Sequence, residues 1–163
     1  MNWEILLAQG LCSFAATAGF GLILDAPRKH LVSCALVGTV NWLIYCAVVW
    51  QGGVITLAAL FSSMAAALMS HVFARTRKSS VSVFLIPGII PTVPGGSIYR
   101  CVYALSRGEA ALSSRYLAET LEIAGAMALG IFITDSLFRI ITEKSHAGRR
   151  GPAGAAASGR PKN

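Results

Sequence analysis

Hydrophobic residues are gathered into five long runs along this chain, and polar residues are confined to short stretches between them. The runs cover residues 5–24, 31–50, 54–74, 81–106 and 116–142. An α-helix of about 20 residues rises ~30 Å, which matches the hydrocarbon core of a bilayer. The pattern therefore predicts an all-α polytopic membrane protein, in which residues 1–142 form one domain of five transmembrane helices.

The fourth run, 81–106, is interrupted near its middle by proline and glycine. The residues concerned are Pro87, Gly88, Pro91, Pro94, Gly95 and Gly96. Proline removes an amide donor and clashes with the preceding turn, and glycine weakens a helix further, so the segment 86–96 cannot be one regular helix. Non-helical backbone at membrane depth survives only where it is buried in protein or lines a wet cavity. Secondary transporters bind solutes at broken helices of this kind; the alternative is a proline kink without a ligand.

The overall composition favours a membrane protein over a soluble domain. Charged residues make up 13% of the chain and hydrophobic residues 55%, whereas soluble domains carry roughly 25% charged residues. The net charge is +7, but the bases lie in loops and in the C-terminal tail without interleaved aromatic residues, which argues against nucleic-acid binding. The four cysteines are far apart in apolar runs and predict neither a disulfide framework nor a metal site. No cofactor is expected.

Polar side chains at and near the break are candidates for a solute path. Ser97, Tyr99 and Arg100 open the second half of the fourth run, where free amides and the positive end of the helix dipole suit an anionic group. An arginine inside an apolar run is a functional candidate; the alternatives are snorkelling and a structural pair with an acidic residue. Asn41, at the centre of the second run, needs a partner that is either a neighbouring helix or the solute.

Acidic and histidine side chains within the runs are candidates for carrying a proton. Glu119 and Glu122 are three residues apart and therefore on one face of the fifth helix. Three roles are open for these glutamates: they take up a proton, they pair with Arg100 or Arg115, or they are solvated at the level of the lipid headgroups. His71 is interpreted as a solvated or capping residue, with a proton carrier as the alternative. Asp135 and Arg139, four residues apart, are expected to form a local ion pair.

The distribution of bases predicts how the chain is oriented. With five crossings, one side of the membrane holds ten Lys and Arg residues, in 25–30, 75–80 and the tail 143–163. The other side holds only two, at the ends of a predicted polar loop from Arg107 to Arg115. This bias places the N-terminus outside and the C-terminus in the cytoplasm. The tail is basic and low in complexity, which predicts disorder.

The motif around the break resembles that of a known family. The segment 85–99 reads LIPGIIPTVPGGSIY and is similar to the signature of the threonine/serine exporter (ThrE-like) family, in particular of its small YjjB-type integral membrane subunit. The resemblance covers the five runs and leaves out the tail. It implies a bacterial inner-membrane protein, without catalytic residues, that exports small amino acids or, in some relatives, a dicarboxylate such as succinate. It also implies transport driven by the proton gradient.

The resemblance implies a partner as well. Full exporters of the family have ten spans, five from a larger domain and five from a domain like this one, so the chain would need the larger five-span subunit, with a higher oligomer possible. An N-terminus outside fits this arrangement, and the two halves would then form an inverted repeat. The expected function is the small membrane subunit of a proton-coupled exporter of small polar metabolites. In this reading the backbone of the break receives the solute, Arg100 is a counter-charge, and Glu119 or Glu122 carries the proton.

Two other functions are compatible with the same runs. The first is a non-transporting assembly or regulatory membrane subunit, which predicts that Arg100 and the glutamates can be neutralised without loss of flux. A membrane enzyme is the third possibility, but the sequence contains no metalloprotease helix motif, no nucleophile elbow and no paired catalytic acid and histidine. The sequence therefore favours a transporter and does not specify its solute.

Overall fold

A computed structural model describes residues 3–149, and the side chains of 4–141 among them. Every regular element in that range is helical, as the hydrophobic pattern predicts. The elements are α1 (Trp3–Ile23), the 3-10 helix η1 (Arg28–His30), α2 (Leu31–Trp50), α3 (Ile55–Arg77), α4 (Val81–Ile89), the 3-10 helix η2 (Ile90–Thr92), α5 (Gly95–Ser106) and α6 (Ala110–Arg149). Four helices are long and apolar enough to cross a membrane, and the bent pair formed by α4–η2 and α5 makes a fifth crossing if it is counted as one span.

Short turns join the first three long helices. Pro27 precedes η1, and proline cannot continue the ladder of α1 because it lacks an N–H. Gly52 adopts a left-handed backbone with φ of 80°, which glycine does without steric cost. The tight turn at Gly52 brings α2 and α3 side by side, as the sequence predicts. Lys78, with φ of 49°, ends α3 in the same left-handed conformation.

The fourth hydrophobic run is broken in the region where its prolines and glycines predict. The two helical parts, 81–92 and 95–106, are bent by 55° relative to each other. The α-helical conformation of α4 nevertheless continues past Pro87 to Ile89. It can do so because the carbonyl of Val83, which the missing N–H of Pro87 leaves free, accepts a hydrogen bond from the Cys34 thiol of α2 at 3.2 Å.

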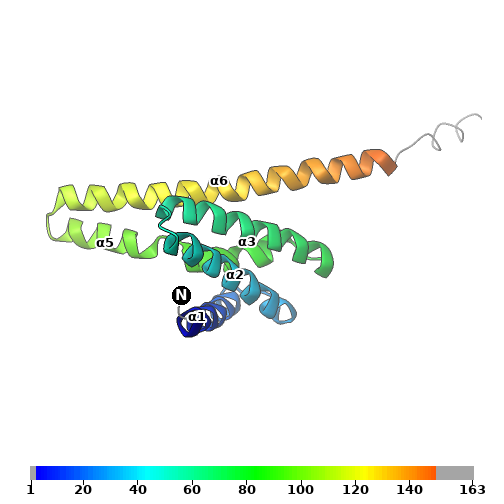
Figure 1. The fold of residues 1–163 in the computed structure, drawn as a ribbon, viewed down its shortest axis with the longest axis horizontal. Helices are drawn as coiled ribbons and strands as arrows, with labels where there is room; N and C mark the ends of the chain where they lie inside the picture. Colours follow the sequence, from blue (N-terminus) through cyan, green and yellow to red (C-terminus); the bar gives the residue numbers. More distant parts are fainter. Residues whose placement is uncertain (1–2, 150–163) are drawn as a thin grey trace, which may run out of the picture.

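The helices α3 and α6 lie side by side and run in the same direction (Figure 1). Gly130 of α6 packs against Leu60 and Ser63 of α3, and further along both helices Asp135 contacts His71. The chain must therefore return between the end of α3 and the start of α6, and it does so through α4, η2 and α5. This path supports a bent pair that crosses the bundle, since a re-entrant loop would leave α6 antiparallel to α3.

The helix α6 is longer at both ends than the fifth run predicts. It begins at Ala110, so the predicted polar loop from Arg107 to Arg115 is wrong and only a short turn around Gly108 remains. The segment 110–115 is polar in part but contains no glycine or proline, and its alanine, leucine and arginine are strong helix formers. At the other end α6 continues to Arg149, so the first seven residues of the predicted disordered tail are helical. The rest of that tail, 150–163, lies outside the described residues.

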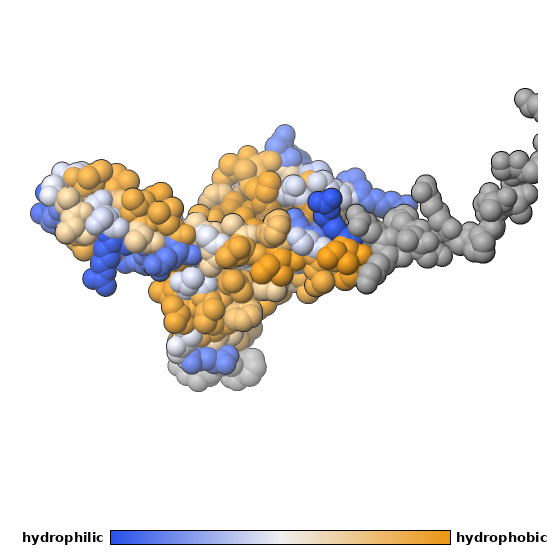
Figure 2. Space-filling model, turned by 90° about the horizontal axis from the view of Figure 1, so that it is seen from above, coloured by the Kyte–Doolittle hydropathy of each residue, from blue (hydrophilic) through white to orange (hydrophobic). Residues whose placement is uncertain are grey.

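The helix α5 packs along the first half of α6, and together they form a hairpin that projects from the other helices (Figure 1). Its exposed side chains include large apolar and aromatic residues: Ile98, Tyr99, Val102, Tyr103, Leu105, Leu117 and Leu121. Apolar residues also cover much of the face of the whole molecule seen in Figure 2. Exposed apolar surface on this scale is typical of contact with lipid or with other membrane helices.

Candidate functional site

A polar cavity lies where the break meets α2, α3 and α6. Its volume is about 260 Å³, slightly below the ~300–1,000 Å³ of pockets that hold drug-sized ligands. The residues that line it are Trp42, Tyr45, Ile55, Pro91, Thr92, Val93, Pro94, Gly96, Ser97, Arg100, Glu119 and Ile123. The cavity thus combines apolar and aromatic walls with one cationic and one anionic side chain, a composition suited to a small polar ligand.

The charged side of the cavity is built by α5 and α6. The hydroxyl of Ser97 donates a hydrogen bond to Oε1 of Glu119 at 3.1 Å, which ties the first turn of α5 to α6. Arg100 lies three residues after Ser97 and therefore on the same face of α5. Its guanidinium carbon is 6.0 Å from the centre of the Tyr116 ring. The hydroxyl, the guanidinium and the carboxylate therefore meet at one wall.

The first turn of α5 adds backbone donors to that wall. The first N–H groups of a helix have no partner within it and carry the positive end of its dipole. A Cβ atom added at Gly95 or Gly96 would meet no neighbouring atom within 4 Å, so the space beside this turn is open. Together with Arg100, the turn can receive an anionic group such as a carboxylate.

Asn41 supports the broken backbone from behind the cavity. It is fully buried, and its amide nitrogen donates hydrogen bonds to the carbonyl of Gly88 at 2.9 Å and to the hydroxyl of Thr92 at 3.0 Å. The Thr92 hydroxyl in turn donates to the carbonyl of Ile89 at 3.0 Å. A polar residue of α2 thus partners backbone that could not stay unpaired in an apolar environment. The sequence left a neighbouring helix and the solute as possible partners of Asn41. In the structure its amide nitrogen bonds the neighbouring helical segment.

The proline and glycine residues of the break face in different directions. Pro91, Pro94 and Gly96 line the polar cavity. Gly88 instead packs against Val37 of α2, and a side chain at that position would overlap it. The break therefore uses some of its small residues for close packing against α2 and others to leave room for a ligand.

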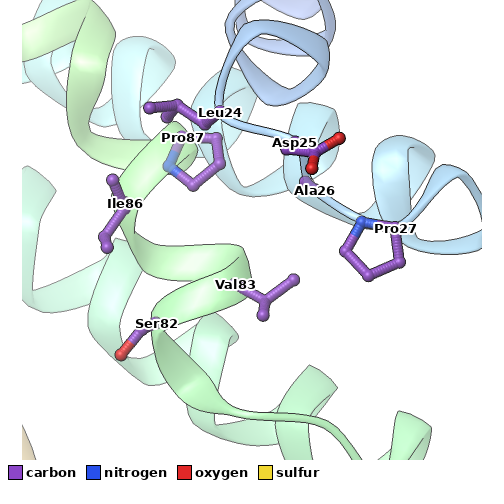
Figure 3. Close-up of a pocket in the computed structure, with 8 residues that line it drawn as sticks. All are labelled: Leu24, Asp25, Ala26, Pro27, Ser82, Val83, Ile86 and Pro87. Atoms are coloured by element: carbon purple, nitrogen blue, oxygen red, sulfur yellow. The ribbon is translucent and has the colours of Figure 1, made fainter.

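Pro87 lines a second cavity, of about 240 Å³, between α4 and the turn that follows α1 (Figure 3). Its lining is mainly apolar, and its residues are Leu24, Asp25, Ala26, Pro27, Ser82, Val83, Ile86 and Pro87. Figure 3 shows the hydroxyl of Ser82 directed away from Asp25. Since this cavity holds one carboxylate and no cationic side chain, it is less suited than the polar cavity to a charged metabolite.

Tyr99 and Glu122 are two further candidates that lie outside the polar cavity, in addition to Asn41, Pro87, Gly88 and Gly95. Tyr99 is 69% exposed and stacks on Tyr103 with ring centres 6.3 Å apart. Glu122 is exposed on α6, whereas Glu119 is half-buried and lines the cavity. The two glutamates are close in sequence, but only Glu119 is placed to contact a ligand there.

The aromatic wall of the cavity was not identified from the sequence. Trp42 and Tyr45 of α2 stack with ring centres 5.5 Å apart, and both line the cavity. Their spacing of three residues places them on one face of the helix. Trp42 also lies near the middle of its hydrophobic run, away from the interfaces where membrane proteins concentrate tryptophan. That unusual depth was the available signal.

His71 and Asp135 contact each other across the interface between α3 and α6. Nε2 of His71 lies 2.6 Å from Oδ1 of Asp135, and the side chains are 16% and 47% exposed. The interpretation of His71 as solvated or capping is therefore wrong, and Asp135 pairs with His71 rather than with Arg139. Sequence spacing reveals neighbours along one helix, whereas this contact depends on how two helices pack.

The cysteines serve packing and hydrogen bonding in the described part of the chain. Cys12 is exposed, Cys34, Cys46 and Cys101 are buried, and all four are free thiols. The thiol of Cys46 donates to Oε1 of Gln9 at 3.2 Å. Within residues 3–149, no group of three or more His, Cys, Asp or Glu side chains is placed to hold a metal ion.

Comparison with known proteins gives one match. A family model described as Threonine/Serine exporter, ThrE, matches residues 9–137. That range extends from α1 to the last third of α6, and it includes the break, the polar cavity and the pair formed by His71 and Asp135. Neither a curated protein nor a solved structure matches the chain.

Proposed function

Because the chain belongs to the threonine/serine exporter family, we propose that it is the small membrane subunit of an exporter, and that its polar cavity contacts the transported amino acid. The observation that carries this proposal is the placement of Arg100 and Glu119 in one cavity at the break of a membrane helix. The family is one of transporters, and broken helices near the middle of a bilayer are a recurrent way for transporters to bind solutes.

The cavity offers complementary partners for a zwitterion. The α-carboxylate of an amino acid would contact Arg100 and the first amides of α5, and its ammonium group would contact Glu119. The hydroxyl of threonine or serine would find a partner in Thr92. A dicarboxylate such as succinate would bring a second anionic group close to Glu119, and like charges at such a distance repel. The cavity therefore favours a hydroxylated amino acid over succinate.

The larger five-span subunit is proposed as the partner that completes the exporter. The α5–α6 hairpin projects from the other helices (Figure 1), and its outer face exposes Tyr99 and Tyr103. Such a surface would suit packing against a second set of membrane helices. The complex would lie in a bacterial inner membrane, with the N-terminus of this chain outside and its C-terminus in the cytoplasm. Transport would be coupled to the proton gradient.

The proposal is tested by comparing Glu119→Gln with Glu122→Gln. Each variant is co-expressed with the larger subunit, and threonine export is measured per unit of membrane-inserted protein. A hydrogen bond to a charged group contributes ~1.5–3 kcal/mol, so Glu119→Gln should lower export roughly tenfold or more. Glu122→Gln is the matched control and should export normally, because Glu122 is exposed.

A second arm of the same experiment uses Arg100→Lys. The ammonium group of lysine does not reproduce the flat fork of a guanidinium, so export should fall while the amount of inserted protein stays unchanged. The chain without its partner should export nothing above background. Normal export by both Glu119→Gln and Arg100→Lys would contradict the proposal and favour a non-transporting assembly or regulatory subunit.

A further inference from the structure

An ionisable pair outside the polar cavity spans the interface between α3 and α6. His71 and Asp135 approach to 2.6 Å, a distance typical of a charge-assisted hydrogen bond. The ring of Phe138 stacks on that of His71, with centres 4.3 Å apart and planes within 7° of each other. The His71 side chain is therefore enclosed on one side by Phe138 and held by Asp135, which is itself half-exposed.

Two arginines lie next to this pair. Arg75 follows His71 by one turn on α3, and its guanidinium carbon is 5.5 Å from the centre of the Phe138 ring. Arg139 follows Asp135 by one turn on α6 and is exposed. The helices α2 and α4 pack on other faces of α3. On that side, His30 of η1 contacts the Phe84 ring of α4. The Cys34 thiol of α2 donates a hydrogen bond to the Val83 carbonyl of α4.

This arrangement suits the binding and release of one proton. With His71 protonated, the pair carries no net charge, which is the state that an apolar environment favours. When the proton leaves Nε2 of His71 for water, the carboxylate of Asp135 remains as an anion. The only covalent bond that breaks in this step is the N–H bond of His71, and the attraction between the two side chains becomes weaker.

The same helix connects the pair to the polar cavity. Asp135 follows Glu119 by 16 residues on α6, a distance of ~24 Å along a helix. The cavity lies between α2 on one side and the α5–α6 hairpin on the other. A change in the attraction between His71 and Asp135 alters how firmly α6 is held against α3.

We propose that His71 and Asp135 form the site that binds the coupling proton of the exporter, separate from the cavity that binds the solute. The inference rests on the proposed transport function and assigns its energy coupling to a site on α3 and α6. The protonated pair holds α6 against α3, and loss of the proton frees α6 and α5 to move relative to α2. Glu119 then acts in solute binding, while His71 carries the proton.

The test uses the purified two-subunit exporter in liposomes and compares two assays. The first measures exchange of threonine for threonine without a pH gradient, which requires solute binding and movement but no net proton transfer. The second measures threonine accumulation driven by a pH gradient, together with the accompanying proton flux reported by an enclosed pH dye. His71→Gln should lose accumulation and proton flux while keeping wild-type exchange. Glu119→Gln should lose exchange as well.

Matched controls separate proton binding from a structural role. His30→Gln replaces a buried histidine that lies edge-on to Phe84 at 5.2 Å, and it should keep both accumulation and exchange. Asp135→Asn preserves the shape of its side chain and should behave as His71→Gln; it is the variant to use if His71→Gln fails to insert. Retained accumulation and proton flux in both variants would overturn the inference. Loss of exchange together with accumulation in both would overturn it too. Absence of exchange in the wild-type complex would instead contradict the proposed transport function.

Discussion

Asn41 makes a break in a membrane helix possible by partnering polar backbone from a neighbouring helix. Its amide group bonds the Gly88 carbonyl and the Thr92 hydroxyl, and the Cys34 thiol bonds the Val83 carbonyl that Pro87 leaves free. Both side chains belong to α2. The irregular backbone is thus tied to a continuous helix, which keeps the cavity beside it in a defined shape.

We expect Asn41→Ala to destabilise the protein. The substitution leaves the buried carbonyl of Gly88 without its Asn41 donor, and an unsatisfied buried polar group costs about 1–3 kcal/mol. The measurement is thermal unfolding in detergent, followed by circular dichroism. Thr39→Val is the matched control on the same helix, because the Thr39 hydroxyl bonds only the Ala35 carbonyl of its own helix. A melting temperature for Asn41→Ala equal to that of Thr39→Val would show that the break does not depend on Asn41.

At the scale of the helices, small residues decide how closely α3 and α6 approach. Gly130 faces the Ser63 side chain and the Leu60 carbonyl of α3, and an added Cβ would lie 2.7 Å from that carbonyl oxygen. Small residues at helix interfaces allow such approach in membranes. The contact sets the register of α6 on α3, and that register brings Asp135 opposite His71.

Gly130→Leu should therefore disrupt the packing of α6 and lower the amount of folded, inserted protein. Gly125→Leu is the matched control, because an added Cβ at Gly125 would meet no neighbouring atom within 4 Å. The measurement is the fraction of membrane protein that remains monodisperse after extraction in mild detergent. Equal recovery of the two variants would mean that the observed approach of α3 and α6 is not needed for folding.

At the scale of the whole molecule, the parallel course of α3 and α6 requires the chain to cross the bundle between them. The broken span provides that crossing, with α4 beginning just after α3 and α5 ending just before α6. The helix α6 has 40 residues and is therefore ~60 Å long, about twice the ~30 Å of a hydrocarbon core. It must extend beyond the core or tilt strongly, and the α5–α6 hairpin is the part that projects in Figure 1.

Site-directed labelling should place the two turns that flank the broken span on opposite sides of the membrane. In a chain without its own cysteines, Ser80→Cys should react with an impermeant thiol reagent only from the cytoplasmic side. Glu109→Cys should react from outside, because the turn between α5 and α6 follows one complete crossing. Both positions are exposed, whereas Ser113 is buried and unsuited as a probe. Reaction of both cysteines from one side would make the bent pair a re-entrant loop.

The sequence by itself determined the helical class, the break and the family to which the motif belongs. The second predicted run, 31–50, coincides with α2, and the family match includes the motif around the break. These properties are local: the length of an apolar run decides whether a helix can cross a bilayer, and proline or glycine disturbs the turns in which it lies. The ends of α6 were missed because polarity alone does not end a helix.

Only the tertiary structure decided which polar residues meet. Glu119 contacts Ser97, Asn41 contacts Gly88, and Asp135 contacts His71, yet in each pair the residues lie on different helical elements. Periodicity indicates the face of a helix on which a residue lies, but not the neighbour that the face will meet. That depends on the rotation and register of two helices, which are set by close approach at residues such as Gly130. For this reason the sequence did not reveal that Glu119 lines the cavity, whereas Glu122, only three residues away, does not.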